Sequence, residues 1–212
     1  MEGVADFMDA VLYAWHSGSE AAKTACDILF GDTVPSGKTA ITFPRNAGHI
    51  PIYYNAMRNR YVGYYGNHSE TSYEDSIAAP YYPFGYGLSY TEFAYSNMRM
   101  DCTEISVKEL KEGKKINCSI DVSNVGGYDG KEVIQLYIHD VAGTYMRPYR
   151  ELKDYKKLLF KVGETRQVSF ELGYDELGYY TPEGSYIVEK GTIEIFIGPD
   201  CYAKEKKVLH VI

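Results

Sequence analysis

Beyond about residue 94 the apolar side chains follow a strict period of two, which constrains the fold of this chain more than any other feature. Ile116, Cys118, Ile120 and Val122 alternate with polar residues, a period that buries one face of a strand and leaves the other in solvent. The same alternation recurs at 134–138, 168–172 and 193–197. Turn signals separate the runs at 124–127, 162–164 and 182–184. Short strands punctuated in this way predict an antiparallel β-sandwich over residues 94–212.

The first 93 residues follow a different pattern. Residues 10–14 are apolar without alternation, which is typical of a strand covered on both faces. Residues 17–20 then offer an N-cap and an acidic first turn, apolar residues recur at helical spacing from Ala22 to Phe30, and Gly31 closes the helix. Residues 39–43 form a second candidate strand. This strand–helix–strand unit is too small to be a domain by itself. We therefore predict one βαβ-type piece of an α/β fold, followed by a long loop over 45–92 that is functional or packed on something large.

The charge and the apolar runs exclude several classes of partner. The net charge is −7, and the lysines and arginines form no basic stripe of the kind that phosphate binding needs. No apolar run approaches the length of a membrane span, and no basic signal-peptide region follows Met1. We expect no nucleic-acid or membrane partner. The location is then cytoplasmic or, if a signal lies upstream, periplasmic or secreted.

The cysteines give no sign of a metal site. Cys26, Cys102, Cys118 and Cys201 lack C-x-x-C spacing and histidines at ligand spacing, so we expect neither a metal nor a cofactor. Cys26 falls in the helical pattern and Cys118 in a strand, for which buried free thiols are the simplest prediction. A disulfide between two of Cys102, Cys118 and Cys201 stays open, because sequence alone does not establish its geometry.

Three blocks of sequence in a fixed order carry a resemblance to a known family. The first includes Trp15-His16-Ser17-Gly18-Ser19-Glu20 and Pro35-Ser36-Gly37-Lys38, the second is Tyr82-Pro83-Phe84-Gly85-Tyr86-Gly87-Leu88-Ser89-Tyr90-Thr91, and the third runs from Val122-Ser123-Asn124 to Glu151-Leu152. Together they resemble the C-terminal half of family 3 glycoside hydrolases, β-glucosidase-like enzymes that end in a fibronectin type III-like domain. The resemblance implies that residues 1–93 close an α/β sandwich domain and that 94–212 form the fibronectin-like domain.

The resemblance also implies an activity whose catalytic groups lie elsewhere. A retaining glycosidase needs two carboxylates about 5 Å apart, one as nucleophile and one as acid/base. In the family the nucleophilic Asp lies on an N-terminal barrel, and the acid/base Glu lies a few tens of residues before the strand that corresponds to 10–14. Both positions are upstream of this chain. We therefore expect no catalytic residue in it and no glycosidase activity from it alone.

Three residues after the first candidate strand are candidates for contact with substrate. The loop that holds His16, Ser17 and Glu20 faces the barrel in the family, which implies a place at the rim of the substrate pocket. Each residue also has a structural interpretation. Glu20 carries a charge suited to a helix N-terminus, and a lone histidine such as His16 is often a hydrogen-bonded structural residue.

Tyr73 and Asp75, in the long loop, are two further candidates. They match a Tyr-x-Asp sequence that precedes the second block in the family. The arginine that commonly stands before this tyrosine is Ser72 here, which weakens any transfer of substrate contacts from the family. Loop charges are also mostly solvated.

Three functions are compatible with these features. The first is a fragment of an exo-glycosidase that hydrolyses terminal sugars of β-linked oligosaccharides. The second is a non-catalytic module that binds polysaccharide or a partner through tyrosine-rich loops, since the chain has 22 tyrosines. The third is one chain of a split glycosidase whose missing barrel is another chain. Because one helix cannot cover both buried strands, we expect residues 1–93 to self-associate or to be partly disordered unless the fibronectin-like domain covers them.

Overall fold

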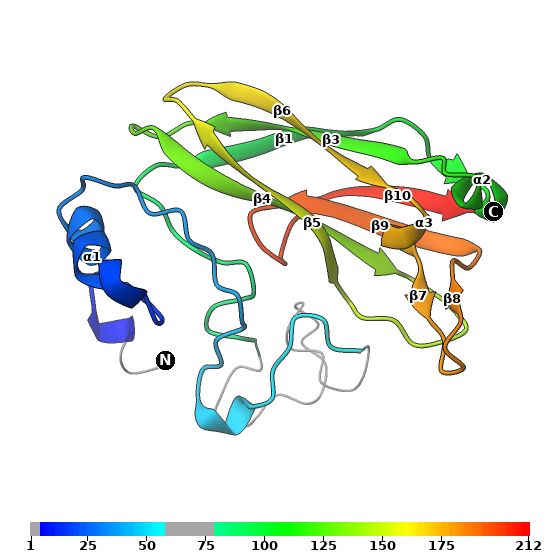
Figure 1. Ribbon diagram of the computed structural model, residues 1–212, viewed down its shortest axis with the longest axis horizontal. Helices are drawn as coiled ribbons and strands as arrows, with labels where there is room; N and C mark the ends of the chain where they lie inside the picture. The colour runs from blue at the N-terminus through cyan, green and yellow to red at the C-terminus, as the bar shows by residue number, and fades with distance from the viewer. Residues whose placement is uncertain (1–4, 58–78) are drawn as a thin grey trace.

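The computed structural model describes residues 5–57 and 79–212, and two packed sheets dominate the described part (Figure 1). The smaller sheet has the strand order β1–β3–β6. Its strands are Phe93–Met100, Ile116–Asn124 and Thr165–Leu172. The larger sheet has the order β2–β10–β9–β4–β5. Its strands, in that order, are Glu104–Ile105, Glu205–Val211, Gly191–Gly198, Gly130–Asp140 and Glu151–Phe160.

The predicted sandwich is confirmed, with one difference in strand direction. The pairs within the two sheets are antiparallel except β2 with β10, which run parallel with Glu104 opposite His210. Short elements close the ends of the sandwich: the helices α2 (Val107–Lys111) and α3 (Tyr174–Leu177), and a small hairpin of β7 (Tyr179–Tyr180) and β8 (Tyr186–Ile187). Because β1 begins at Phe93, the sandwich starts close to the domain boundary that we predict at residues 93 and 94, which stays a prediction.

The apolar side chains of the alternating runs meet between the two sheets. Ile120 of β3, Leu136 of β4 and Ile195 of β9 are completely buried and belong to one cluster. Burying each of these side chains stabilises the fold by about 1.5–3 kcal/mol. The period of two therefore identified the core of this half correctly.

Strand β4 is buried on both of its faces, which the alternation did not predict. Gln135 and Tyr137 point away from the core between the sheets, yet 2% and 0% of their surface is exposed. The second face is covered by Ile52, Tyr54 and Phe84 from the first half of the chain. The outer face of the larger sheet is therefore an interface with the preceding residues.

The described residues before the sandwich form helices but no strand. They contain the 3₁₀ helices η1 (Ala5–Phe7), η2 (Gly18–Glu20) and η3 (Ala47–His49) and the α-helix α1 (Ala21–Leu29). Of the two segments predicted as strands, 10–14 forms no ladder, and 39–43 has a single isolated bridge between Phe43 and Tyr82. A strand is defined by hydrogen bonds to a neighbour, and the described residues supply neither segment with a neighbouring strand.

Helix α1 lies at one end of the molecule, away from both sheets (Figure 1), and none of its residues is buried. Large apolar side chains at its end and beside it are exposed, with 67% for Leu29, 83% for Phe30 and 84% for Phe7. The expected apolar surface of the first half is therefore present.

None of the four cysteines forms a disulfide, and the three in the sandwich are less exposed than the one on α1. Cys118 is buried between the sheets and its burial raises the pKa of the thiol to about 12. Cys26 on α1 is exposed, so the prediction of a buried thiol was wrong there, because nothing in the described residues covers this helix. In the two described ranges no helix has the length and apolar character that a membrane span requires.

Two segments, residues 34–45 and 79–92, pair with each other beside the larger sheet, and we call them the junction segments. The amide of Thr39 donates to the carbonyl of Tyr86 at 2.7 Å, and the amide of Gly85 donates to the carbonyl of Thr39 at 2.8 Å. Further along, the amide of Phe43 donates to the carbonyl of Tyr82 at 2.9 Å. These bonds replace part of the missing ladder.

The close approach of the junction segments predicts the effect of Gly87→Ala. A Cβ atom at Gly87 would lie 2.3 Å from the carbonyl oxygen of Gly37, so that the two backbones would have to separate. We expect this substitution to lower the free energy of unfolding by about 1–3 kcal/mol, as overpacking does elsewhere. Urea unfolding of the 212-residue chain measures it.

The matched control is Gly127→Ala, because a Cβ at Gly127 meets nothing within 4 Å. We expect this change to stay within about 0.5 kcal/mol of the parent chain. Equal free energies of unfolding for the two variants would contradict the close approach at Gly87.

Candidate functional site

Three of the candidate substrate-proximal residues lie on an exposed turn that an aromatic cluster holds in place. The rings of Tyr13 and Trp15 meet edge to face, with centroids 4.6 Å apart, and the ring of Phe43 lies 5.1 Å from that of Tyr13. Phe43 also contacts Tyr82 at 6.2 Å. Aromatic pairs in such geometry contribute about 0.5–1.5 kcal/mol each beyond the area they bury. The cluster therefore fastens the turn to both junction segments.

Three of the five predicted residues are brought together on this turn. His16, Ser17 and Glu20 follow the cluster within one tight bend and are all exposed. Ser17 Oγ donates to the carbonyl of Ala14 at 2.6 Å and closes the bend. Trp15, just before them, has φ of +48°, a left-handed conformation that costs a non-glycine residue about 1–2 kcal/mol. The surrounding cluster holds the backbone in this strained state.

Glu20 occupies the N-cap position of α1, where its side chain makes no capping hydrogen bond. Its carboxylate is therefore an exposed charge near the first turn of a helix, as the structural interpretation predicts, and it points to no specific partner. The other two predicted residues, Tyr73 and Asp75, lie outside the described residues. Whether any of the five contacts a substrate stays a prediction.

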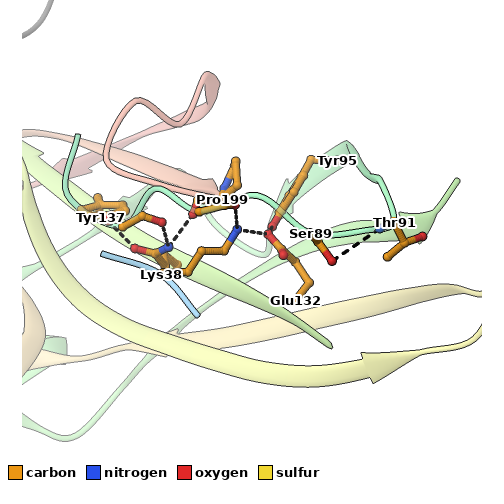
Figure 2. A network of polar contacts seen from close by, with 10 residues as sticks. Lys38, Ser89, Thr91, Tyr95, Glu132, Tyr137 and Pro199 are labelled. Carbon is orange, nitrogen blue, oxygen red and sulfur yellow. Dashed lines mark hydrogen bonds and ion pairs between the residues drawn. The ribbon is translucent and has the colours of Figure 1, made fainter. Parts of the chain in front are cut away.

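A buried ion pair joins the first junction segment to the larger sheet. Lys38 Nζ lies 3.1 Å from Glu132 Oε1 of β4, and only 13% and 4% of the two side chains is exposed. Lys38 Nζ also donates to the carbonyl of Gly87 at 3.1 Å. One ammonium group therefore connects both junction segments to β4 (Figure 2).

The carboxylate of Glu132 has a second donor from the smaller sheet. The hydroxyl of Tyr95 on β1 donates to Glu132 Oε1 at 2.8 Å (Figure 2). Burial, and after it the nearby carboxylate, raise the pKa of Tyr95 far above its ordinary value, so the phenol remains a donor. Buried charges are tolerated when they are paired and hydrogen-bonded, and Glu132 meets both conditions.

Gln135, three residues after Glu132 on β4, connects the second junction segment to the sheet. Its amide nitrogen donates to the carbonyl of Gly85 at 3.2 Å, and its amide oxygen accepts from the hydroxyl of Tyr137 at 2.5 Å. Gly85 has φ of +80°, and a Cβ there would lie 2.3 Å from Gln135 Oε1. Only glycine therefore lets the backbone approach this amide.

Aromatic packing completes the junction. The ring of Tyr54 stacks on that of Phe84 with centroids 4.1 Å apart and meets the ring of Tyr137 edge to face at 6.0 Å. The amide of Cys201, after β9, donates to the carbonyl of Phe84 at 3.2 Å. The outer face of the larger sheet thus recognises the junction segments through both polar and apolar contacts.

The polar side chains of the junction are bonded to one another, so the junction has a structural role. Its lysine and carboxylate neutralise each other, and its tyrosines act as donors. In the part of the chain that the structure describes, no group of three or more His, Cys, Asp or Glu side chains is arranged to hold a metal ion. The arrangement links the turn of His16, Ser17 and Glu20 to the sandwich through direct contacts.

No motif or spacing in the sequence indicates a role for Lys38, Tyr95, Glu132 or Gln135. Gln135 and Tyr137 occupy the polar positions of an alternating strand, and this pattern predicts a solvated face. A weak signal was present, since glutamine and tyrosine stand there instead of lysine or glutamate, and both suit a hydrogen-bonded interface. Nothing in the local sequence singles out Glu132 as a buried charge.

Two family models match the chain in the same order as the two structural halves. Residues 1–90 match the glycosyl hydrolase family 3 C-terminal domain, and residues 132–201 match the fibronectin type III-like domain. The first match supports the α/β assignment for a half in which α1 is the one α-helix within the described residues.

Curated relatives resemble nearly all of this chain but are much longer. The periplasmic β-glucosidase of Salmonella typhimurium is 38% identical over 91% of the chain, which spans 25% of that protein. A β-xylosidase of Formosa agariphila is 34% identical over 97% of the chain, which spans 27% of that protein. The chain thus spans about a quarter of the length of these relatives.

Solved structures show the same relation. The crystal structure of a β-glucosidase from Listeria innocua in complex with laminaribiose has a TM-score of 0.86 and 32% identity, over 98% of this chain and 28% of the other. The order of the two domains, the described fold and these relatives agree. The chain therefore belongs to glycosyl hydrolase family 3 and corresponds to the C-terminal region of its members, where the end of an α/β domain is followed by a fibronectin type III-like domain.

Proposed function

We propose that this chain is the C-terminal part of a β-glucosidase-like exo-glycosidase that hydrolyses terminal β-linked sugars with retention of configuration. Its similarity to β-glucosidases and a β-xylosidase of about four times its length carries the proposal. A retaining mechanism requires a nucleophilic Asp and an acid/base Glu about 5 Å apart. We place both upstream of residue 1, in the barrel and in the earlier part of the α/β domain.

In this proposal the chain contributes positioning and part of the pocket rim. His16, Ser17 and Glu20 lie on the exposed turn, and Tyr73 and Asp75 complete the set of substrate-proximal residues. The aromatic cluster and the junction hold that turn against the sandwich. Productive substrate geometry depends on placement to within about 1 Å, so a rigid junction would matter to the rate even though it touches no substrate.

A separate observation favours a chain that needs a further partner. Phe7, Leu29 and Phe30 are largely exposed, and α1 buries none of its residues. Apolar surface of this kind marks a contact face. The missing barrel and the rest of the α/β domain would cover it, whether they belong to the same polypeptide or to the second chain of a split glycosidase.

The first prediction is that the 212-residue chain alone has no glycosidase activity above background. Without the carboxylate pair, acid/base and covalent contributions of several orders of magnitude each are absent. Hydrolysis of an aryl β-glucoside by the purified chain measures this, with a complete family 3 β-glucosidase as the positive control. Turnover that Glu20→Gln or Asp75→Asn abolishes would contradict the proposal.

The second prediction concerns the buried ion pair. Glu132→Gln leaves the Lys38 ammonium buried without its carboxylate, and we expect a loss of about 3 kcal/mol in the free energy of unfolding. Hydrogen exchange at the amides of Thr39 and Gly85 should speed up as well, because these amides pair the junction segments. Urea unfolding and exchange measured by mass spectrometry check the two effects.

The same substitution at the surface is the control. Glu171 pairs with Lys115 at 2.8 Å, with 62% and 57% of the side chains exposed, and Glu171→Gln should change stability by less than about 1 kcal/mol. Lys38→Met combined with Glu132→Gln should cost less than the sum of the single changes. Additive effects would mean that the pair is not coupled.

The third prediction is that the isolated chain self-associates through the exposed apolar side chains of its first half. Light scattering should show a concentration-dependent increase in mass, and Phe30→Glu should reduce it because the charge disrupts the apolar face. Tyr155→Glu is the control, since Tyr155 is 61% exposed on β5 of the sandwich. A monomeric parent chain at all concentrations would refute the prediction.

A further inference from the structure

A cluster of tyrosines lies at the end of the molecule opposite α1, on the hairpin of β7 and β8 and on the helix α3 (Figure 1). Tyr180 and Tyr186 face each other across the hairpin, and their rings meet edge to face with centroids 4.9 Å apart. The ring of Tyr174 on α3 follows, 5.8 Å from that of Tyr186. The three rings therefore form one continuous row, which we call the tyrosine row.

Tyr180 presents the tyrosine row to solvent. It is 73% exposed, whereas Tyr179, the residue before it on β7, is buried. Among residues 174–188, all of which the structure describes, Tyr180 is the one large hydrophobic residue that is exposed. A ring in edge-to-face contact with a single neighbour keeps at least one of its faces open. The hairpin therefore offers a flat apolar surface with a hydroxyl at its edge.

Hydrogen bonds and close packing fix the rings behind Tyr180. The hydroxyl of Tyr186 donates to the carbonyl of Asp175, and the hydroxyl of Tyr174 donates to the carbonyl of Tyr186 at 3.3 Å. A Cβ at Gly178 would lie 2.4 Å from the Cε1 atom of Tyr186, so this ring packs directly on the backbone. An aromatic surface that is already ordered loses little conformational entropy when it binds a ligand.

The hairpin is also fastened on its other face. Successive strand residues point to opposite faces, and there the hydroxyl of Tyr179 donates to Glu189 Oε2. The guanidinium carbon of Arg147 lies 4.1 Å from the centroid of the Tyr179 ring. In the turn, the amide of Thr181 donates to the carbonyl of Ser185 at 2.8 Å. The hairpin is therefore a supported platform for the tyrosine row.

Acceptors and hydroxyls border the tyrosine row. Glu183, in the turn of the hairpin, and Asp175, on α3, are exposed carboxylates. A hydrogen bond from the side chain of Thr181 holds the pKa of Glu183 below its ordinary value, so this carboxylate is charged at neutral pH. The ammonium of Lys111 lies 6.0 Å from the ring centroid of Tyr174, on the α3 side of the row. The hairpin side of the row therefore accepts hydrogen bonds and repels anions.

We propose that the tyrosine row binds a neutral saccharide chain, with one pyranose ring stacked on Tyr180 and its hydroxyls donating to the neighbouring carboxylates. A pyranose ring carries C–H groups on its faces and hydroxyls at its rim, so it matches a flat aromatic ring bordered by acceptors. A protein partner would need a broader apolar face than one exposed ring provides. The proposal does not rest on the catalytic assignment, because it concerns binding by the described chain alone.

Calorimetric titration of the 212-residue chain with cellohexaose tests this proposal. We expect saturable binding by the parent chain and a loss of affinity of about fivefold in Tyr180→Ala, the size of one aromatic contact. Tyr180→Phe should keep most of the affinity, because the ring face remains. Trigalacturonate should bind more weakly than cellohexaose, because the exposed carboxylates repel its charges.

The matched control is Tyr155→Ala, since Tyr155 is a tyrosine of β5 that is 61% exposed. A thermal melt of each variant establishes that it is folded. Absence of saturable binding by the parent chain would overturn the proposal, and so would an equal loss of affinity in Tyr155→Ala and Tyr180→Ala. A loss in Tyr180→Phe as large as that in Tyr180→Ala would overturn stacking on the ring. Trigalacturonate binding as tightly as cellohexaose would overturn the assignment to a neutral saccharide.

Discussion

The arrangement of this molecule depends on one buried ion pair, between Lys38 of the first junction segment and Glu132 of β4. Two charges removed from water are tolerated only when each is satisfied, and here Gly87 and Tyr95 supply the remaining hydrogen bonds. A buried pair of this kind accepts few alternative geometries, since any other placement would leave a charge unpaired. It therefore specifies how the end of the α/β domain sits on the sandwich, more than it adds to overall stability.

A series of contacts connects this ion pair and its neighbours to the exposed turn. Gln135 and Tyr137 hold the backbone around Gly85, and the paired junction segments lead to Phe43. Phe43 in turn packs against Tyr13 and the strained Trp15, next to His16. Each link is a direct contact between neighbours, so the fibronectin-like sheet positions the turn without lying next to it. This gives the sandwich a physical role in positioning the turn although it does not touch it.

The two halves of the chain differ in how much of their apolar surface they bury. The sandwich buries its apolar residues in one continuous core between two sheets. The residues around α1 instead leave Phe7, Leu29 and Phe30 in solvent, and the segment at 10–14 has no strand partner among the described residues. The apolar surface that the described residues of the first half leave exposed has the character of an interior face of a larger domain.

The sequence by itself determined the sandwich, because the alternation at 116–122 and in its companion runs reports directly which side chains share a face. It also determined helix α1 and the family, through blocks such as Tyr82 to Thr91. It predicted strands at 10–14 and 39–43 that lack ladders here, because an apolar segment encodes the capacity to pair but not the presence of a neighbour. Only the tertiary structure decided that Glu132 and Gln135 are buried, since the burial of a polar residue depends on a segment about 50 to 100 residues away that packs over it.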